Sequence, residues 1–220
     1  MTASQLYRIS GLSLLSGAVA FVVHVVLRSW ITAGVDPSVV AEQGLWVPVN
    51  VLGVMGAVLV LLGMPAMYAR VAGSMGMFGL VGVALIAVGW IFFGLFLSLY
   101  AALVSPWLSD KAPSLVAASA PLSAGIVVAF AVGLGAWFAG GALFGIPFIR
   151  GRVRPRWVGY LLPASALWVV VGDVVIAPGG PAANLAVNLL SNLGPVLFLV
   201  AVGYLGLQMW EVNGVAAASA

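Results

Sequence analysis

The sequence predicts an all-α fold: a polytopic transmembrane helical bundle with six spans and with both termini on the cytoplasmic side. Two observations lead to this prediction. Of the 220 residues, 64% are hydrophobic and only 6% are charged, whereas a soluble domain carries roughly 25% charged residues. The basic residues also concentrate in the short segment 150–156, between two long apolar runs. Such an apolar surface needs lipid as its solvent, and a basic loop beside apolar helices stays on the cytoplasmic side of a membrane.

A membrane-spanning helix needs about 20 mostly apolar residues, and six segments of one transmembrane domain, residues 1–220, meet this requirement. They cover about residues 9–30, 46–68, 74–104, 121–148, 157–176 and 184–210. The third segment is long enough to tilt in the bilayer. Pro163 and Pro195 fall inside the fifth and sixth segments, where a missing N–H group should kink the helix.

The distribution of basic residues sets the orientation. If segment 150–156 is cytoplasmic, an even number of spans precedes it and both termini are cytoplasmic. The cytoplasmic side then holds six basic residues, Arg8, Arg70, Arg150, Arg152, Arg154 and Arg156, and the outer side holds two, Arg28 and Lys111. This asymmetry agrees with the positive-inside rule and predicts a multi-pass membrane protein with both termini on the cytoplasmic side.

Several classes of function find no support in the sequence. The chain has no cysteine and one histidine, which excludes disulfides, thiolate metal sites and multi-histidine metal sites within one chain. No HExxH, GxSxG or Walker pattern occurs, and the predicted spans carry no carboxylate pair suited to acid–base catalysis. We therefore predict no catalytic residues, metal site or cofactor. The few basic residues are explained by topology, so the expected partner is the lipid bilayer and not a nucleic acid.

Polar residues inside the spans form the candidate site. Such residues are costly in lipid and tend to face the bundle interior or a water-filled cavity. With the predicted topology, eight of them fall in the outer half of the membrane: His24, Arg28, Asn50, Tyr100, Asp173, Asn184, Asn188 and Asn192. This common depth predicts a polar pocket that opens to the outer face and that binds or passes a small polar or amphipathic molecule.

The spacing of these residues supports a shared site. His24 and Arg28 are four residues apart, as are the successive asparagines of the sixth segment, so each set lies on one helix face. Arg28 and Asp173 are plausible ion partners, because an unpaired charge near hydrocarbon is costly. The alternative is a purely structural network, in which Asn184 caps the sixth helix and the other asparagines hold helices together. The protein would then be a non-catalytic accessory or scaffold subunit of a membrane complex.

A small-residue motif on the fourth segment bears on this alternative. Gly141 and Gly145 form a GxxxG element, and small residues mark places where helices approach closely in lipid. The motif is consistent with packing inside one chain. It is also consistent with a homo-oligomer or a membrane-protein partner that docks on the Gly141/Gly145 face.

Three short motifs carry a resemblance to a protein family. They are an opening R-x-x-G-L, a helix end G-x-P-x-x-Y-x-R and a later P-R-W-x-G, found here as Arg8–Leu12, Gly63–Arg70 and Pro155–Gly159. On these motifs the chain resembles uncharacterised bacterial multi-span integral membrane proteins. The resemblance implies a bacterial cytoplasmic membrane and supplies no activity and no site residues.

Overall fold

Every regular element of the described chain is a helix. The computed structural model describes residues 3–112, 115, 124–176 and 184–218, and within these ranges the predicted all-helical fold is confirmed. The elements are α1 (Ala3–Thr32), α2 (Pro37–Val40), α3 (Trp46–Met75), α4 (Met77–Trp90), η1 (Ile91–Phe96), α5 (Leu97–Leu99), η2 (Tyr100–Val104), α6 (Ser105–Lys111), α7 (Ala124–Ile149), α8 (Arg156–Val170), η4 (Val171–Ile176), α9 (Leu185–Ser191) and α10 (Leu193–Ala218). The elements labelled η are π-helical stretches.

Five helices are long and apolar enough to cross a membrane. They are Gln5–Thr32, Trp46–Met75, Met77–Lys111, Ala124–Ile149 and Leu193–Glu211, and they correspond to five of the six predicted spans. The predicted fifth span, 157–176, folds as α8 followed by η4 and is not among the five. Charged residues occur near both of its ends, Arg156 and Asp173, so its apolar part is shorter than in the other helices.

In the second predicted span, the apolar run ends at an earlier residue than the helix that contains it. The apolar run ends near Tyr68, but α3 continues to Met75. Hydropathy marks the part of a helix that can lie in hydrocarbon, while residues such as Arg70 keep helical geometry beyond it. The chain reverses at Gly76, whose φ of 50° falls in the left-handed region that favours glycine.

The predicted sixth span is two helices. α9 ends at Ser191 and α10 begins at Leu193, with Asn192 between them. Pro195 has no N–H to donate to the Ser191 carbonyl, so it is tolerated in the first turn of a new helix but not inside a continuous one. Trp168 of α8 supports the break, because its Nε1 donates to the Leu190 carbonyl at 2.9 Å.

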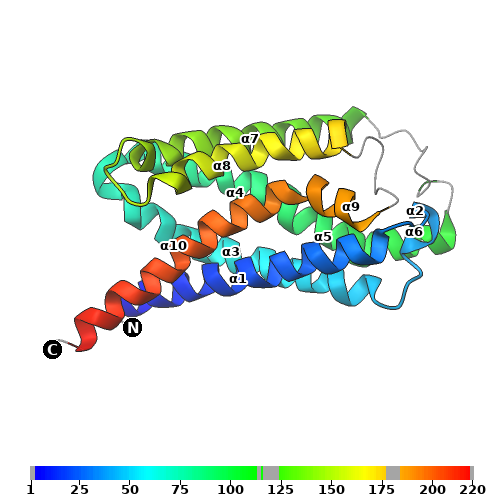
Figure 1. The fold of residues 1–220 in the computed structure, drawn as a ribbon, viewed down its shortest axis with the longest axis horizontal. Helices are drawn as coiled ribbons and strands as arrows, with labels where there is room; N and C mark the ends of the chain where they lie inside the picture. The colour runs from blue at the N-terminus through cyan, green and yellow to red at the C-terminus, as the bar shows by residue number, and fades with distance from the viewer. Residues whose placement is uncertain (1–2, 113–114, 116–123, 177–183, 219–220) are drawn as a thin grey trace.

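The long helices lie side by side along one axis of the molecule (Figure 1). α1 packs against α3 and α10, and α7 packs against α4 and α8. The contacts of α3 with α4 and of α8 with α10 close these pairs into a ring. The α7–α8 connection and the N-terminus lie at one end of the bundle, and α2 and α6 lie at the other (Figure 1).

Aromatic side chains from four helices meet in the centre of the bundle. Trp90 stacks on Phe198 with 4.8 Å between ring centroids, and Trp137 approaches Phe198 edge-on at 5.3 Å. Phe21 of α1 lies 4.8 Å from Trp90. Such pairs stabilise a core by about 0.5–1.5 kcal/mol each beyond the area they bury, so this cluster fixes α1, α4, α7 and α10 against one another.

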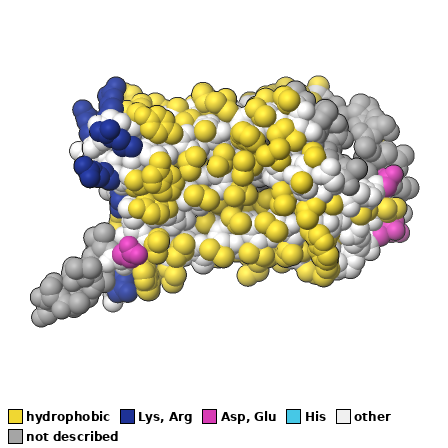
Figure 2. Space-filling model, viewed as in Figure 1, with side chains coloured by type: hydrophobic (Ala, Val, Ile, Leu, Met, Phe, Trp, Pro, Cys, Tyr) yellow, Lys and Arg dark blue, Asp and Glu magenta, His cyan; other side chains and the backbone are white. Residues whose placement is uncertain are grey.

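Arginines from distant parts of the sequence meet at one end of the bundle. Arg8 lies over the Trp210 ring, 4.6 Å from its centroid. Nη2 of Arg70 donates to the Arg154 carbonyl at 3.3 Å and to Oε1 of Gln208. Figure 2 shows the basic side chains at this end and a band of apolar side chains around the middle. We call this the arginine-rich end; its residues are Arg8, Arg70, Arg150, Arg152, Arg154 and Arg156.

Candidate functional site

At the opposite end of α1, polar side chains, most of them buried, gather in a set that we call the polar layer. It comprises His24, Arg28, Ser29, Asn50, Ser98, Asp173 and Asn188. His24 is only 1% exposed, and its Nδ1 lies 2.8 Å from the Val49 carbonyl of α3. The ring can come this close because residue 53 is glycine: a Cβ there would stand 2.8 Å from Nδ1. His24 thus joins α1 to α3 through a backbone contact.

Asn50 and Ser98 continue the polar layer on the α3 side. Asn50 is fully buried; its Nδ2 donates to the Trp46 carbonyl at 2.8 Å, and its Oδ1 has no hydrogen-bond partner among the described residues. The Ser98 hydroxyl donates to the Gly94 carbonyl at 2.7 Å. The same hydroxyl would lie 2.8 Å from a Cβ on Gly53, so Ser98 and His24 both lie against Gly53 of α3.

Arg28 of α1 lies near residues of both α3 and η4. Its guanidinium carbon is 5.7 Å from the centroid of the Trp46 ring, within the range of a cation–π contact. Its charge also attracts the carboxylate of Asp173 on η4. No direct ion pair within 4.0 Å joins the two in the described structure, where Lys111 and Asp110 form such a pair at 2.8 Å. Arg28 and Asp173 therefore attract each other electrostatically without forming a direct ion pair.

Asn188 of α9 binds to the α1 part of the polar layer. It is 1% exposed, and its Nδ2 donates to the Ser29 carbonyl at 3.3 Å and to the Thr32 hydroxyl at 3.4 Å. Asn192, one turn later, donates from Nδ2 to the Asn188 carbonyl at 2.8 Å. The Ser29 hydroxyl itself is buried without a partner among the described residues. Asn188 therefore joins α9 to the face of α1 next to the one that carries His24.

Two of the predicted site residues stand apart from this buried set. The Tyr100 side chain is 41% exposed on η2. Asn184 is also exposed, and its Oδ1 accepts a hydrogen bond from the Val187 N–H at 2.9 Å, so it caps α9. The structure thus gathers His24, Asn50 and Asn188 around α1, brings Asp173 within electrostatic reach of Arg28, and places Tyr100 and Asn184 at the surface.

Three π-helical stretches border the polar layer. η1 and η2 pack against α3, and η4 packs against α9. The contact of η4 is close, since a Cβ on Gly172 would lie 2.1 Å from the Ser191 carbonyl oxygen. π-helical turns are rare and occur frequently at functional sites, which distinguishes this layer from the rest of the bundle.

The sequence did not indicate Ser29 and Ser98 as members of the polar layer, nor Thr32 as a hydrogen-bond partner of Asn188. Serine and threonine are common in membrane helices, where their hydroxyl groups usually bond to a carbonyl of the preceding turn. Ser98 and Thr32 make such bonds, to Gly94 and Arg28. The π-helical stretch η1 also has no signature in the sequence, because its residues are as apolar as the α-helices around it.

The GxxxG element of α7 faces α8 of the same chain. A Cβ on Gly141 would lie 2.9 Å from the Leu162 carbonyl oxygen, and one on Gly145 would lie 2.5 Å from that of Gly159. Both glycines are buried. The short side chains therefore let α7 and α8 approach backbone to backbone, as expected for small residues at helix contacts in lipid.

No family model, no curated protein and no solved structure matches this chain. Functional arguments therefore rest on the geometry of the polar layer and of the arginine-rich end.

Proposed function

We propose that this is a six-span protein of the cytoplasmic membrane, with both termini on the cytoplasmic side, whose polar layer binds a small polar or amphipathic molecule from the outer side. The orientation is supported by the arginine-rich end of the bundle, where Figure 2 shows basic side chains gathered and where Arg8, Arg70 and Arg154 make their contacts. Positive charge beside membrane helices marks the cytoplasmic face. The polar layer then lies toward the outer face.

The proposal needs one span beyond the five long apolar helices, and this is the predicted fifth span, which the structure forms from Arg156 to Ile176. Its 15 residues of α8 and 6 residues of η4 reach roughly 30 Å at about 1.5 Å per residue, which matches the hydrocarbon thickness of a bilayer. The segment packs against α7 and α10 inside the bundle. Protein neighbours therefore cover part of its surface, and it needs less hydropathy of its own than a helix surrounded by lipid.

The observation that carries the binding proposal is a pair of buried polar atoms that find no hydrogen-bond partner within the described part of the chain, Oδ1 of Asn50 and Oγ of Ser29. A buried polar atom without a hydrogen bond costs about 1–3 kcal/mol. A polar ligand that supplies a donor to Asn50 and a partner to Ser29 recovers this cost on binding. The two residues belong to α3 and α1, which pack against each other, so the proposal requires a molecule that reaches both helices.

The other residues of the polar layer have complementary roles in this proposal. Arg28 supplies a positive charge, and Asp173, which is exposed, balances it near the entrance. Asn188 and His24 shape the interior by holding α9 and α3 against α1. Exposed polar groups at the rim and buried ones at the floor suit a ligand that enters from water.

Cysteine accessibility tests the proposal, because the natural chain contains no cysteine. We expect Ser29→Cys to react in intact cells with a small membrane-impermeant thiosulfonate, since the proposed site opens outward. Arg152→Cys should react only after the membrane is permeabilised. Ser165→Cys, which replaces a fully buried serine of α8 outside the polar layer, should react in neither case.

Two results would contradict the proposal. Reaction of Arg152→Cys in intact cells would reverse the orientation. A Ser29→Cys protein as inert as Ser165→Cys would mean that the polar layer is closed to water, and the accessory or scaffold role would then be the better account of the chain.

A further inference from the structure

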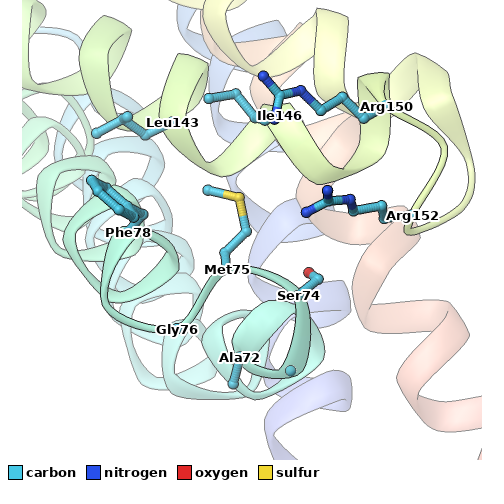
Figure 3. A pocket seen from close by; sticks show the side chains of 10 residues that line it. Ala72, Ser74, Met75, Gly76, Phe78, Leu143, Ile146, Arg150 and Arg152 are labelled. Carbon is cyan, nitrogen blue, oxygen red and sulfur yellow. The ribbon is translucent and has the colours of Figure 1, made fainter.

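A second place in the molecule has the features of a ligand site, at the arginine-rich end. An open hollow of about 580 Å³ lies between the α3–α4 turn and the last turns of α7. Figure 3 shows the Arg150 and Arg152 side chains extending over this hollow, toward Ile146 and Met75. Its volume falls in the range of about 300–1,000 Å³ that is typical of sites for small ligands.

The two arginines of the hollow are not neutralised by acidic residues. Arg150 and Arg152 are exposed, and the described structure shows no ion pair for either of them. None of the five acidic residues of the chain lines the hollow. Two guanidinium groups that converge on one space without a counter-charge favour an anion, and arginine suits phosphate in particular because its planar donors match the phosphate oxygens.

The backbone beside the hollow contributes dipoles of both signs, because α3 ends at Met75 and α7 at Ile149 while α4 begins beside them. α4 begins at Met77 after Gly76, and no side chain caps its first turn. The N–H groups of an uncapped first turn and the helix dipole favour negative charge at this end. Open space also lies beside the backbone here, because a Cβ on Gly73 or Gly76 would find no atom within 4 Å.

The other wall of the hollow is apolar and continues into the lipid-facing surface. Leu143 and Ile146 line it together with Phe78, whose side chain is 69% exposed. The neighbouring Met77 is 71% exposed. A hollow with cationic groups on one side and exposed apolar groups on the other fits a molecule that is anionic at its head and apolar in its tails.

We propose that this hollow binds the phosphate headgroup of an anionic glycerophospholipid from the leaflet at the arginine-rich end. Arg150 and Arg152 contact the phosphate oxygens, the first turn of α4 faces the same charge, and the acyl chains lie along Phe78 and Ile146. Basic pockets between membrane helices are known to hold anionic headgroups. This site is separate from the polar layer, which lies toward the opposite end of the bundle.

Lipid binding by the full chain in mild detergent tests this proposal, with native mass spectrometry as the readout. Phosphatidylglycerol is the probe and phosphatidylcholine the neutral reference. The double variant Arg150→Gln/Arg152→Gln should bind phosphatidylglycerol at least about tenfold more weakly, the loss expected for two charge-assisted contacts. Arg154→Gln/Arg156→Gln removes the same charge from residues that do not line the hollow and should bind within about threefold of the natural chain.

A second variant tests the hollow without changing its charge. Gly73→Leu fills open space beside α3 and should weaken phosphatidylglycerol binding while both arginines remain. Equal losses in the two double variants would show a general attraction of the basic end for anionic lipid and would overturn the site. Unchanged binding in Arg150→Gln/Arg152→Gln would overturn it as well. Displacement of phosphatidylglycerol by millimolar inorganic phosphate would mean that the ligand is free phosphate, contrary to the proposal.

Discussion

The polar layer and the arginine-rich end use polar residues in opposite ways. In the polar layer, His24, Asn50 and Asn188 are buried and bond to backbone carbonyls. At the arginine-rich end, Arg150 and Arg152 are exposed beside an open hollow. A buried polar group is cut off from water and needs a partner from the protein or from a ligand, because leaving it unpaired is costly. An exposed charge at the membrane surface has no such requirement and stays available to a ligand.

The same contrast appears in the backbone of a single helix. Gly53 and Gly73 both belong to α3, but the first lies in the polar layer and the second beside the hollow. A Cβ on Gly53 would meet His24 and Ser98 at 2.8 Å, whereas one on Gly73 would meet nothing within 4 Å. Glycine is required sterically at the first position and not at the second.

The largest effect is therefore expected for Gly53→Ala. The added methyl group pushes the His24 ring off the Val49 carbonyl, and overpacking of this kind costs about 1–3 kcal/mol. Gly73→Ala is the matched control and should stabilise the protein by roughly 0.5–1 kcal/mol, because alanine favours a helix over glycine. Thermal unfolding of both variants in the same detergent measures the difference. Equal melting temperatures would remove the proposed distinction between the two regions.

A smaller effect is expected for Asn188→Leu. The substitution removes the hydrogen bonds to Ser29 and Thr32, and such bonds between membrane helices contribute about 0.6–2 kcal/mol. Arg152→Gln is the control from the arginine-rich end, where no bond between helices is lost. A chain that tolerates Asn188→Leu as well as it tolerates Arg152→Gln would show that Asn188 does not hold α9 on α1. Loss of folding would show that the bond stabilises more than this range.

The smallest effect is expected for substitutions of two tryptophans that each lie beside an arginine. Trp46→Phe keeps a ring near Arg28 but loses the bond from Nε1 to the Ala101 carbonyl, 2.7 Å long, at a cost of about 1 kcal/mol. Trp210→Phe loses no described hydrogen bond and only weakens the contact with Arg8, so its effect should be about half as large or less. Chemical denaturation in mixed micelles compares the two, and a larger loss for Trp210→Phe would contradict the assignment.

Part of the candidate site could be predicted from the sequence. Polar side chains in a predicted span are costly in lipid, and this reasoning placed His24, Asn50 and Asn188 in the interior, where all three are buried. The same reasoning could not separate Tyr100 from them. A tyrosine can keep its ring in an apolar environment and its hydroxyl near water, so its residue type does not decide between core and surface.

Helix pairing was equally hard to predict for the small residues. Gly141 and Gly145 carried a signal for close helix approach, and the signal was consistent with either another chain or the same chain. In the structure these glycines lie against Leu162 and Gly159 of α8. The sequence motif indicates how closely a neighbouring helix can approach. Only the arrangement of the helices determines which helix that neighbour is.

The sequence by itself determined the helical class, the membrane environment and the clustering of arginines in one connection. These properties follow from local composition, since the cost of a charge in hydrocarbon and the length of an apolar run need no knowledge of distant residues. The tertiary structure alone decided which carbonyl each buried polar group meets, where the sixth helix breaks against Gly172 and Trp168, and that Arg150 and Arg152 share a hollow with the start of α4. Each of these depends on backbone atoms far apart in the chain, and residue types do not specify how closely such atoms approach.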